Sequence, residues 1–328
     1  MKVIHMKNLS LGIDLGGTKI LGIVVDEKYK IISNDKVKTK YRLSPEEICR
    51  QMKGIADSAL SNAGASWNDV KNIGIAVPAS IDPATGDGLH APALGWKDLP
   101  IKQTLEDVFG RKIFLENDVN CGTYAEFKLG AGKGFKNVVG YFVGTGLGGG
   151  VVIDGKLLRG TRGVAGELGH EVVKMDGRAC GCGKNGCIEA YCSKTAFGKQ
   201  FDKQIRKKKR SSIITKYYEG DFTRLKSKAF AKAFAAGDEV TMEILEDGFK
   251  ALGIAASNIA TILAPECIVL GGGVVEGVGE GVLPFFQKSF DENLFALKPG
   301  DIAIRLSKLG DDAVPLGAIF NAVAKGKI

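Results

Sequence analysis

The sequence contains few histidines, tryptophans or prolines, and it has no long apolar run. Of its 328 residues, three are histidine, two tryptophan and nine proline. The longest apolar candidate, Val138 to Ile153, is interrupted by glycines and does not reach the roughly 18 residues that a membrane span needs. No long apolar stretch precedes Asp14, so we expect no secretory signal peptide. With so few prolines, the abundant glycine does not indicate a low-complexity chain.

Three nucleotide-binding signatures are also missing. The chain has no GxxxxGK[ST] motif, which excludes a P-loop, and no HRD or DFG motif, which excludes the protein-kinase glycine loop. Gly144-x-Gly146-x-x-Gly149 matches the dinucleotide pattern, but the residues after it continue as a β-rich run where that fingerprint requires a helix. A Rossmann site, and with it an NAD-dependent dehydrogenase, is therefore not expected.

What is present describes a globular chain of two parts. Apolar residues make up 45% and charged residues 25%, which is close to the average of globular proteins and excludes disordered, collagenous and coiled-coil classes. A single hydrophobic core stops growing near 250–300 residues, so we expect two lobes. The net charge of +8 favours an anionic partner such as a nucleotide without selecting one.

A strand, a glycine turn and a second strand are predicted at Leu9–Asp26 and again at Val138–Ile153, which is compatible with two similar lobes. Further strands are expected at Ile31–Val37, Lys71–Val77, Ile113–Leu115 and Cys267–Leu270. Helices are expected from Ser44-Pro45-Glu46-Glu47 onward and at Leu99–Phe109, Asn120–Leu129, Thr241–Leu263 and Val314–Ala324. Ser193–Gly237 is predicted to be helical and very basic, with Lys207–Arg210 on a solvated face; it lacks the interleaved aromatic residues of a nucleic-acid site.

Three glycine clusters follow predicted strands. They are Asp14-Leu15-Gly16-Gly17-Thr18-Lys19, the run from Gly144-Thr145-Gly146 to Gly150, and Gly271-Gly272-Gly273. Each alone could be an ordinary hairpin turn. Together they favour phosphate binding, because residues without a side chain let several backbone N–H groups approach an anion. Asp14 at a strand end would hold Mg²⁺, directly or through water, or else cap its turn.

The tripeptide Glu116-Asn117-Asp118 ends one predicted strand and precedes a helix. A kinase that acts on an alcohol needs a carboxylate within hydrogen-bond reach of the attacking hydroxyl, and a strand end would hold one rigidly. The structural alternative is a helix N-cap, for which Asn and Asp are both typical.

A histidine and several cysteines have the spacing of a metal site. Four of the seven cysteines fall within Cys180–Cys192, and His170, Cys180, Cys182 and Cys187 follow the pattern H-x9-C-x-C-x4-C. One imidazole and three thiolates complete a tetrahedral shell, which is typical of a structural zinc site without an open position. Cys192 is a possible alternative ligand. Reduced cysteine ligands favour a cytoplasmic setting.

These motifs together resemble the ROK family (repressors, open reading frames and kinases) over essentially the whole chain. DLGGTK, ENDVNCGTYAE, GTGLGGGVV, ELGH, CGCGKNGCIE and VLGGGV occur in the family's order. The resemblance implies an α/β, two-lobed actin-like ATPase (ribonuclease H-like) fold with a cleft between lobes. The lobes would be residues 1–118 plus 312–328 and residues 119–311.

The resemblance also implies roles for individual residues. Asp118 would be the catalytic base, and Asn117, Glu167, His170 and Glu189 would bind the sugar hydroxyls. His170, Cys180, Cys182 and Cys187 would hold zinc. The nucleotide would lie among Asp14, Gly16, Gly17, Thr18, Lys19, Gly144, Thr145, Gly146, Gly271, Gly272 and Gly273. The implied activity is Mg·ATP-dependent phosphorylation of a hexose at C6, with glucose as the first candidate and a homodimer or higher homo-oligomer as the assembly.

The sequence departs from the family's kinases beside the expected sugar site, where His90 and Ala93 replace frequent asparagines. N-acetylglucosamine, N-acetylmannosamine and fructose therefore stay open as substrates, as does a catalytically silent sugar-sensing regulator. Family repressors carry a winged helix-turn-helix before the first glycine turn, and the 13 residues before Asp14 are too few for one, so a repressor is not expected.

Overall fold

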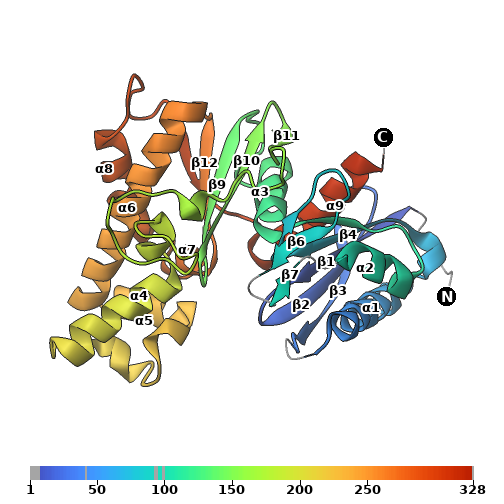
Figure 1. Cartoon of the computed structure of the whole chain (residues 1–328), viewed down its shortest axis with the longest axis horizontal. Helices are drawn as coiled ribbons and strands as arrows, with labels where there is room; N and C mark the ends of the chain where they lie inside the picture. The colour runs from blue at the N-terminus through green and yellow to red at the C-terminus, as the bar shows by residue number, and fades with distance from the viewer. Residues whose placement is uncertain (1–7, 41–42, 92–94, 98–99, 327–328) are drawn as a thin grey trace. The chain divides into compact units, whose positions relative to one another are not determined.

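The computed structural model describes residues 8–40, 43–91, 95–97 and 100–326, which form two compact units (Figure 1). Unit 1 contains the described residues up to Lys128, together with Leu157–Ala165 and the chain from Asp311 onward. Unit 2 contains Leu129–Lys156 and Gly166–Gly310. No helix in the described part of the chain combines the length and apolar character needed to cross a bilayer.

Unit 1 is built on a five-stranded sheet of order β3-β2-β1-β4-β8. Its strands are β1 (Leu9–Leu15), β2 (Lys19–Val25), β3 (Ile31–Lys38), β4 (Val70–Val77) and β8 (Phe114–Asn117). β1 pairs antiparallel with β2 and parallel with β4, and β4 pairs parallel with β8. Its helices are α1 (Pro45–Asn62), α2 (Ile101–Phe109), α3 (Asp118–Lys128) and α9 (Ala313–Lys325).

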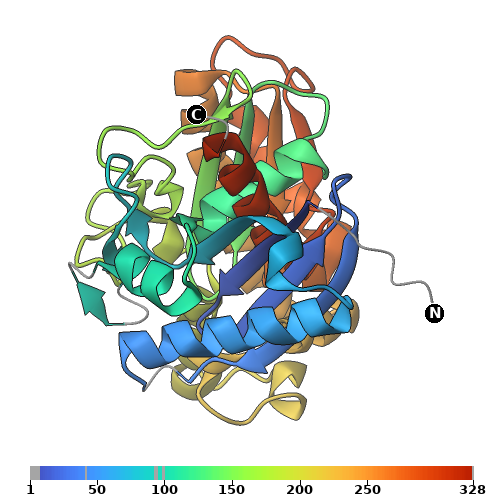
Figure 2. The same cartoon turned by 90° about the vertical axis from the view of Figure 1, so that its right-hand side faces the viewer.

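Two helices cover opposite faces of this sheet at close range (Figures 1 and 2). A side chain at Gly22 of β2 would meet Ile55 of α1, whereas one at Gly74 of β4 would lie 2.0 Å from the Ala318 carbonyl oxygen of α9. Gly12 of β1 faces α9 in the same way. Glycine at these positions therefore sets how closely the helices pack on the strands.

The predicted start of the first long helix is confirmed. Ser44 caps α1, and its side chain accepts from the backbone N–H of Glu47 while the Glu47 carboxylate accepts from the Ser44 N–H at 2.8 Å. Pro45 occupies the first turn, where its missing N–H has no intrahelical partner to lose. This reciprocal pair is a capping box.

Unit 2 repeats the sheet of unit 1, with the order β11-β10-β9-β12-β13. Its strands are β9 (Val138–Val143), β10 (Leu147–Ile153), β11 (Lys156–Leu157), β12 (Cys267–Gly271) and β13 (Ala303–Leu306); the boundary between the units falls within β11, after Lys156. β9 pairs antiparallel with β10 and parallel with β12, and β12 pairs parallel with β13. The predicted repeat of strand, glycine turn and strand is thus confirmed, at the same place in both sheets.

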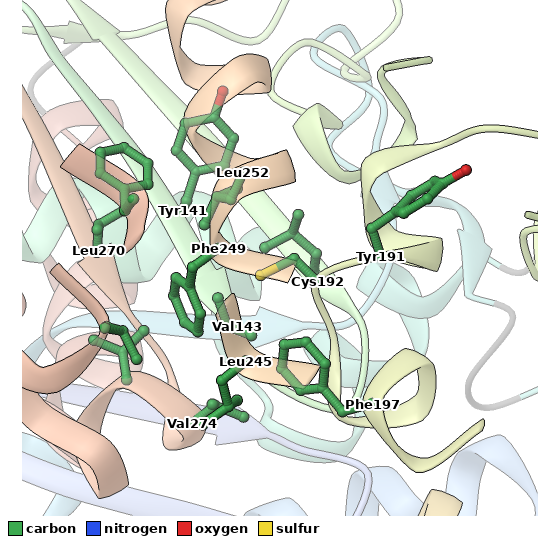
Figure 3. Packing of buried hydrophobic residues seen from close by; sticks show 14 of the residues in the cluster. Tyr141, Val143, Tyr191, Cys192, Phe197, Leu245, Phe249, Leu252, Leu270 and Val274 are labelled. Carbon is green, nitrogen blue, oxygen red and sulfur yellow. The ribbon is translucent and has the colours of Figure 1, made fainter. Parts of the chain in front are cut away.

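The long helix α6 (Glu239–Leu263) packs in the centre of unit 2 (Figure 3). Its Phe249 and Leu252 lie among Tyr141 of β9, Cys192 and Phe197, all fully buried. The other helices of this unit are α4 (Lys194–Phe201), α5 (Ser227–Ala235), α7 (Gly273–Val278) and α8 (Leu283–Glu292).

Two features differ from the sequence-based expectation. Ser193–Gly237 is not continuously helical: α4 ends in a π-helical turn (Asp202–Lys207), Lys209 has a left-handed φ of 58°, and two short 3-10 turns precede α5. The helical run ends at Lys209, because a residue in the left-handed region cannot continue a right-handed helix. A third sheet of β5 (Ser80–Ile81), β6 (Gly88–Ala91) and β7 (Trp96–Lys97) was not predicted, because its strands are too short to show a period.

The unit boundaries also differ from the predicted lobes in three places. Residues 119–128 and 157–165, and the single residue Asp311, group with unit 1. The first range does so because α3 packs along α9, and the second because its Arg159 binds Glu116 at the end of β8.

The close approach of α9 to β4 gives a stability prediction. Gly74→Ala should lower the free energy of unfolding by about 1–3 kcal/mol or more, because the new methyl would overlap the Ala318 carbonyl and force the helix outward. Gly54→Ala, on the exposed side of α1 with nothing within 4 Å, is the matched control and should gain about 0.5–1 kcal/mol. Urea unfolding measures both, and equal stabilities would contradict the packing described.

Candidate active site

Two predicted site carboxylates lie at one edge of the unit 1 sheet. Asp14 is next to the last residue of β1, and Asp118 follows β8 as the first residue of α3. Because β1, β4 and β8 run parallel, their carboxyl ends meet at the same edge. Burial, and then the nearby negative charge of Asp118, raise the pKa of Asp14 to about 7, against a smaller lowering by Lys19. A divalent cation at Asp14 would relieve both effects.

The turn after Asp14 is fixed by backbone hydrogen bonds. The Gly16 N–H donates to the Lys19 carbonyl at 2.9 Å, and the Thr39 hydroxyl donates to the Gly16 carbonyl at 2.6 Å. The Lys19 ammonium forms an ion pair with Asp311. Gly17 is exposed and a side chain there would meet nothing within 4 Å, so the fold does not itself require glycine. Glycine at this position would be required by a ligand that approaches the backbone closely, because any side chain would stand in its way.

Asn117 acts as a helix cap. Its Oδ1 accepts from the N–H groups of Val119 at 2.9 Å and Asn120 at 3.0 Å, while its Nδ2 donates to the Ala79 carbonyl at 3.3 Å. Asp118, which is half-buried, also accepts from the Val119 N–H, at 2.9 Å to Oδ1. Asn117 thus forms the helix N-cap that the sequence offered as the alternative to a catalytic-site role. Its contact with a sugar stays a prediction.

A buried charge network behind Asp118 was missed at the sequence level. Glu116 is 2% exposed and binds the Nε of Arg159 at 2.6 Å, and Arg159 Nη2 donates to Asn321 at 2.7 Å. The three residues come from β8, the segment Leu157–Ala165 and α9. No local spacing in the sequence signals such a contact, because Arg159 and Glu116 are 43 positions apart.

Two of the three glycine clusters meet at one edge of the unit 2 sheet. Gly144–Gly146 is the tight turn from β9 to β10, closed by the Gly144 N–H donating to the Gly146 carbonyl at 2.9 Å. Gly271 ends the parallel neighbour β12, opposite Phe142 of β9. At Gly272, φ is +84° and a Cβ would lie 2.7 Å from the Val143 nitrogen. Backbone N–H groups from two strand ends can therefore face a single anion here.

Glu189 links this turn to the segment of residues 171–192 that carries the cysteines, which is called the cysteine loop below. Its Oε2 accepts from the Leu147 N–H at 3.0 Å, and its Oε1 lies 3.5 Å from the Cys180 sulfur. A Cβ at Gly146 would overlap the carboxylate at 2.3 Å, so glycine is needed for this contact. Glu167 is exposed, and its carbonyl accepts from the His170 N–H at 3.0 Å in the short turn Leu168–His170.

A pocket of about 570 Å³ opens beside the turn in unit 2. The turn supplies Thr145 and Gly146 to its wall, the cysteine loop supplies Glu189 and Arg178, and α4 supplies Lys199. Lys199, the Glu189 carboxylate, and Arg178, which is ion-paired with Asp247 at 2.7 Å, bring charge to a pocket wall that is otherwise mostly apolar.

The predicted metal ligands come together. Single ligand atoms of His170, Cys180, Cys182 and Cys187 all lie within 4.8 Å of one another. The Cys182–Cys187 sulfur separation is 3.7 Å, as is the distance from His170 Nδ1 to the Cys180 sulfur. Tetrahedral bonds of about 2.3 Å to one zinc ion place sulfurs about 3.8 Å apart, so the donor set fits Zn²⁺.

The alternative ligand Cys192 does not belong to this cluster. It is fully buried in the core of unit 2, where burial raises the pKa of its thiol, and it is not among the grouped ligand atoms of the described residues. Burial also raises the pKa of the Cys180 thiol to about 12, so this sulfur would ionise near neutral pH only against a cation.

Of the two positions at which kinases of the resembled family often have asparagine, His90 and Ala93, only one lies within the described residues. Ala93 lies outside the described residues. His90 lies in β6, where its backbone pairs with Ser80 and Lys97.

A comparison with protein families matches residues 10–325 to the ROK family. This chain belongs to the ROK family. Its fold class is therefore the α/β actin-like ATPase fold of that family, as the motifs predicted, and each unit carries one copy of the repeated sheet.

Several relatives align over almost the whole chain. A glucokinase of Halalkalibacterium halodurans is 32% identical over 94% of this chain and 92% of its own length. The structure of a ROK family glucokinase from Streptomyces griseus, in complex with glucose and AMPPNP, is 32% identical with a TM-score of 0.84 over 97% of this chain and all of that one. A xylose repressor of Caldicellulosiruptor bescii is 28% identical over 96% of this chain and 78% of its own length.

The environment of Asp14 predicts a pH-dependent stability effect. Its folded-state pKa is raised, so the carboxyl group costs nothing well below its unfolded pKa of 3.8, where it is protonated in both states, and its cost grows as pH rises from there to about 7. In metal-free buffer, Asp14→Asn should therefore raise the free energy of unfolding by about 1–4 kcal/mol at pH 8 and by much less near pH 4.

Denaturant unfolding across this pH range measures the effect. Asp107→Asn, at an exposed position on α2, is the control and should show little change. A gain for Asp14→Asn that is the same at both pH values would contradict the raised pKa.

Proposed function

We propose that this protein is an ATP-dependent hexose kinase that phosphorylates the C6 hydroxyl, with glucose as its first substrate. The observation that carries the proposal is the pairing of a half-buried carboxylate, Asp118, with a second, buried carboxylate, Asp14, at the end of parallel strands. The likeness to glucokinases over nearly the full chain supports the same reaction.

Asp118 is the proposed base. It accepts the proton of the sugar hydroxyl as the oxygen attacks the γ-phosphorus of ATP in line. Its backbone is fixed at the first position of α3, and the Asn117 cap directly before it removes local freedom. Because this chemistry depends mainly on positioning, the rigid strand end contributes by holding the carboxylate where the hydroxyl binds.

Asp14 is the proposed holder of the metal that accompanies ATP. When bound, Mg²⁺ neutralises charge on the β- and γ-phosphates. The raised pKa of Asp14 means that proton and metal compete for its carboxylate, so metal affinity should weaken as pH falls below about 7.

The glycine turns are the proposed phosphate contacts. Gly16, Gly17, Thr18 and Lys19 belong to unit 1, and Gly144, Thr145 and Gly146, together with Gly271, Gly272 and Gly273, belong to unit 2. Space for a ligand beside the backbone is clearest at Gly17, where a side chain would meet nothing within 4 Å, and at Gly144, where it would meet only the Gly146 carbonyl at 3.9 Å.

Sugar recognition is assigned to Asn117, Glu167, His170 and Glu189. A ligand bond from His170 Nδ1 to zinc would leave its Nε2 as a donor for a hydroxyl, so both proposed roles of this histidine are compatible. N-acetylglucosamine, N-acetylmannosamine and fructose offer similar hydroxyls and are the alternative substrates of the same site.

Zinc is proposed as a structural ion held by His170, Cys180, Cys182 and Cys187. Four protein ligands leave no open position, so its contribution would be to fix the loop that bears Glu189. Reduced thiol ligands suit a cytoplasmic location, and we retain a homodimer or higher homo-oligomer as the proposed assembly.

A sugar-sensing regulator without turnover is the second candidate, and the similarity to a xylose repressor favours keeping it. Both candidates bind sugar, so only product formation separates them.

A coupled assay of ADP release tests the function. The wild-type protein with Mg·ATP should phosphorylate glucose, and a panel of the alternative sugars compared by kcat/KM should rank glucose first. Asp118→Asn should lower kcat by about 100-fold or more and leave sugar binding, followed by calorimetry, largely unchanged, because it removes only the proton acceptor.

Two results would contradict this function. Sugar binding without ADP release from any hexose of the panel would favour the regulator. Near-normal turnover by Asp118→Asn would refute the assignment of the base. Asp107→Asn on the surface of α2 is the matched control and should retain wild-type kcat.

Metal analysis tests the zinc site. Protein purified under reducing conditions should contain about one zinc per chain, and Cys187→Ser should lose it together with thermal stability. Cys49→Ser, at a buried cysteine of α1 in unit 1, is the control and should keep the metal. Folded wild-type protein without zinc would overturn the assignment.

A further inference from the structure

Glu116 is a buried carboxylate whose polar contacts all serve to fix the end of β8. Its side chain is 3% exposed, with Oε2 on Arg159 Nε at 2.6 Å. Its Oε1 accepts from the Asn117 N–H at 3.1 Å and from the Asn120 side chain at 3.3 Å. One carboxylate therefore holds both the strand end and the first turn of α3.

Arg159 closes a loop of interactions around the same strand end. Its Nη2 donates to Asn321 Oδ1 at 2.7 Å, and Asn321 Nδ2 donates to the Leu115 carbonyl at 3.2 Å. The backbone is thus held at Leu115 on one side of Glu116 and at Asn117 on the other. A planar guanidinium can reach both partners at once because its donors form a rigid fork.

The segment that carries Arg159 is itself firmly seated on unit 1. Gly163 has φ +69°, and a Cβ there would overlap the Ile81 carbonyl at 1.8 Å. The Ala165 N–H donates to the Arg159 carbonyl at 3.1 Å. Arg159 is therefore presented to Glu116 by a loop of fixed shape, on a side chain that is 27% exposed.

We propose that Arg159, acting through Glu116 and Asn321, is a positioning residue for Asp118, an inference that rests on the proposed kinase function. Asp118 lies two residues beyond Glu116 and begins α3, so a shift of the strand end moves its carboxylate relative to the hydroxyl. A displacement of about 1 Å costs about 100-fold in rate in well-oriented reactions. Arg159 itself does not touch the reacting atoms.

Removing Arg159 takes away the cation that is hydrogen-bonded to the buried Glu116 carboxylate, and leaves Lys325 of α9 as the positive charge that still interacts with it. The carboxylate then reorients or takes up a proton, and either change weakens its bonds to the Asn117 N–H and to Asn120. A purely structural role would lower stability alone. A positioning role lowers kcat in the folded enzyme and changes KM for sugar and ATP little.

The experiment compares Arg159→Gln, Arg159→Lys and the double variant Arg159→Gln/Glu116→Gln with wild type in the ADP-release assay. Arg159→Gln should lower kcat by about 10- to 100-fold with KM within about threefold. Arg159→Lys keeps the charge without the fork and should fold normally, yet lose about threefold or more in kcat. The double variant removes the uncompensated charge and should recover part of the kcat lost in Arg159→Gln.

Arg224→Gln is the control, because its arginine forms an exposed ion pair with Asp221 and should leave kcat unchanged. Circular dichroism and thermal unfolding establish that each variant is folded. Wild-type kcat in folded Arg159→Gln overturns the role. Should that variant not fold, wild-type kcat in Arg159→Lys overturns it. An inactive wild-type protein instead overturns the proposed function, and this role with it.

Discussion

Parallel pairing of β1 with β4, and of β4 with β8, is the constraint on which the candidate site depends. It brings two carboxylates that are about a hundred positions apart in the sequence to one edge of a sheet, Asp14 at the end of β1 and Asp118 after β8. Burial and the charge of Asp118 raise the pKa of Asp14 to about 7, so its carboxyl group is partly protonated at neutral pH. The same pairing of β9 with β12 brings the two glycine turns of unit 2 to one edge. The two sheets thus share one topology. The edge of the first carries two acidic residues, and the same edge of the second carries two glycine turns.

The acidic pair and the cluster of metal-ligand side chains are less favourable in the folded chain alone than with a bound cation. Two carboxylates near each other in a poorly solvated place are unfavourable until a cation arrives, and the Cys180 thiol stays protonated near neutral pH until a metal binds it. Both clusters lie beside glycine-bearing turns in which the backbone is fixed by hydrogen bonds rather than by side-chain packing. Binding of a cation would therefore offset the electrostatic cost that the Asp14 carboxylate has in the folded chain.

Local features could be predicted from the sequence because their physical causes are local. Ser44, Pro45 and Glu47 define a helix start, and the spacing of His170 and the cysteines defines a ligand set. The repeated strand and glycine turn gave the two related sheets. The network of Glu116, Arg159 and Asn321 could not be found in this way, since its members lie on three distant segments and no periodicity connects them. The sequence allows Asn117 to be either a helix cap or a site residue, and only the hydrogen bonds of its side chain show that it forms the cap.

The packing of α9 on glycines of β1 and β4 has a consequence for how the protein is made. The ribosome adds β1 and β4 early, but the helix that covers them follows only after all of unit 2 has been synthesised. Until then one side of the first sheet, shaped by Gly12 and Gly74 to accept a helix backbone, stays uncovered in the nascent chain. Unit 2 can complete its own sheet sooner. During translation, unit 1 would therefore stay incomplete until α9 has been synthesised, after the whole of unit 2.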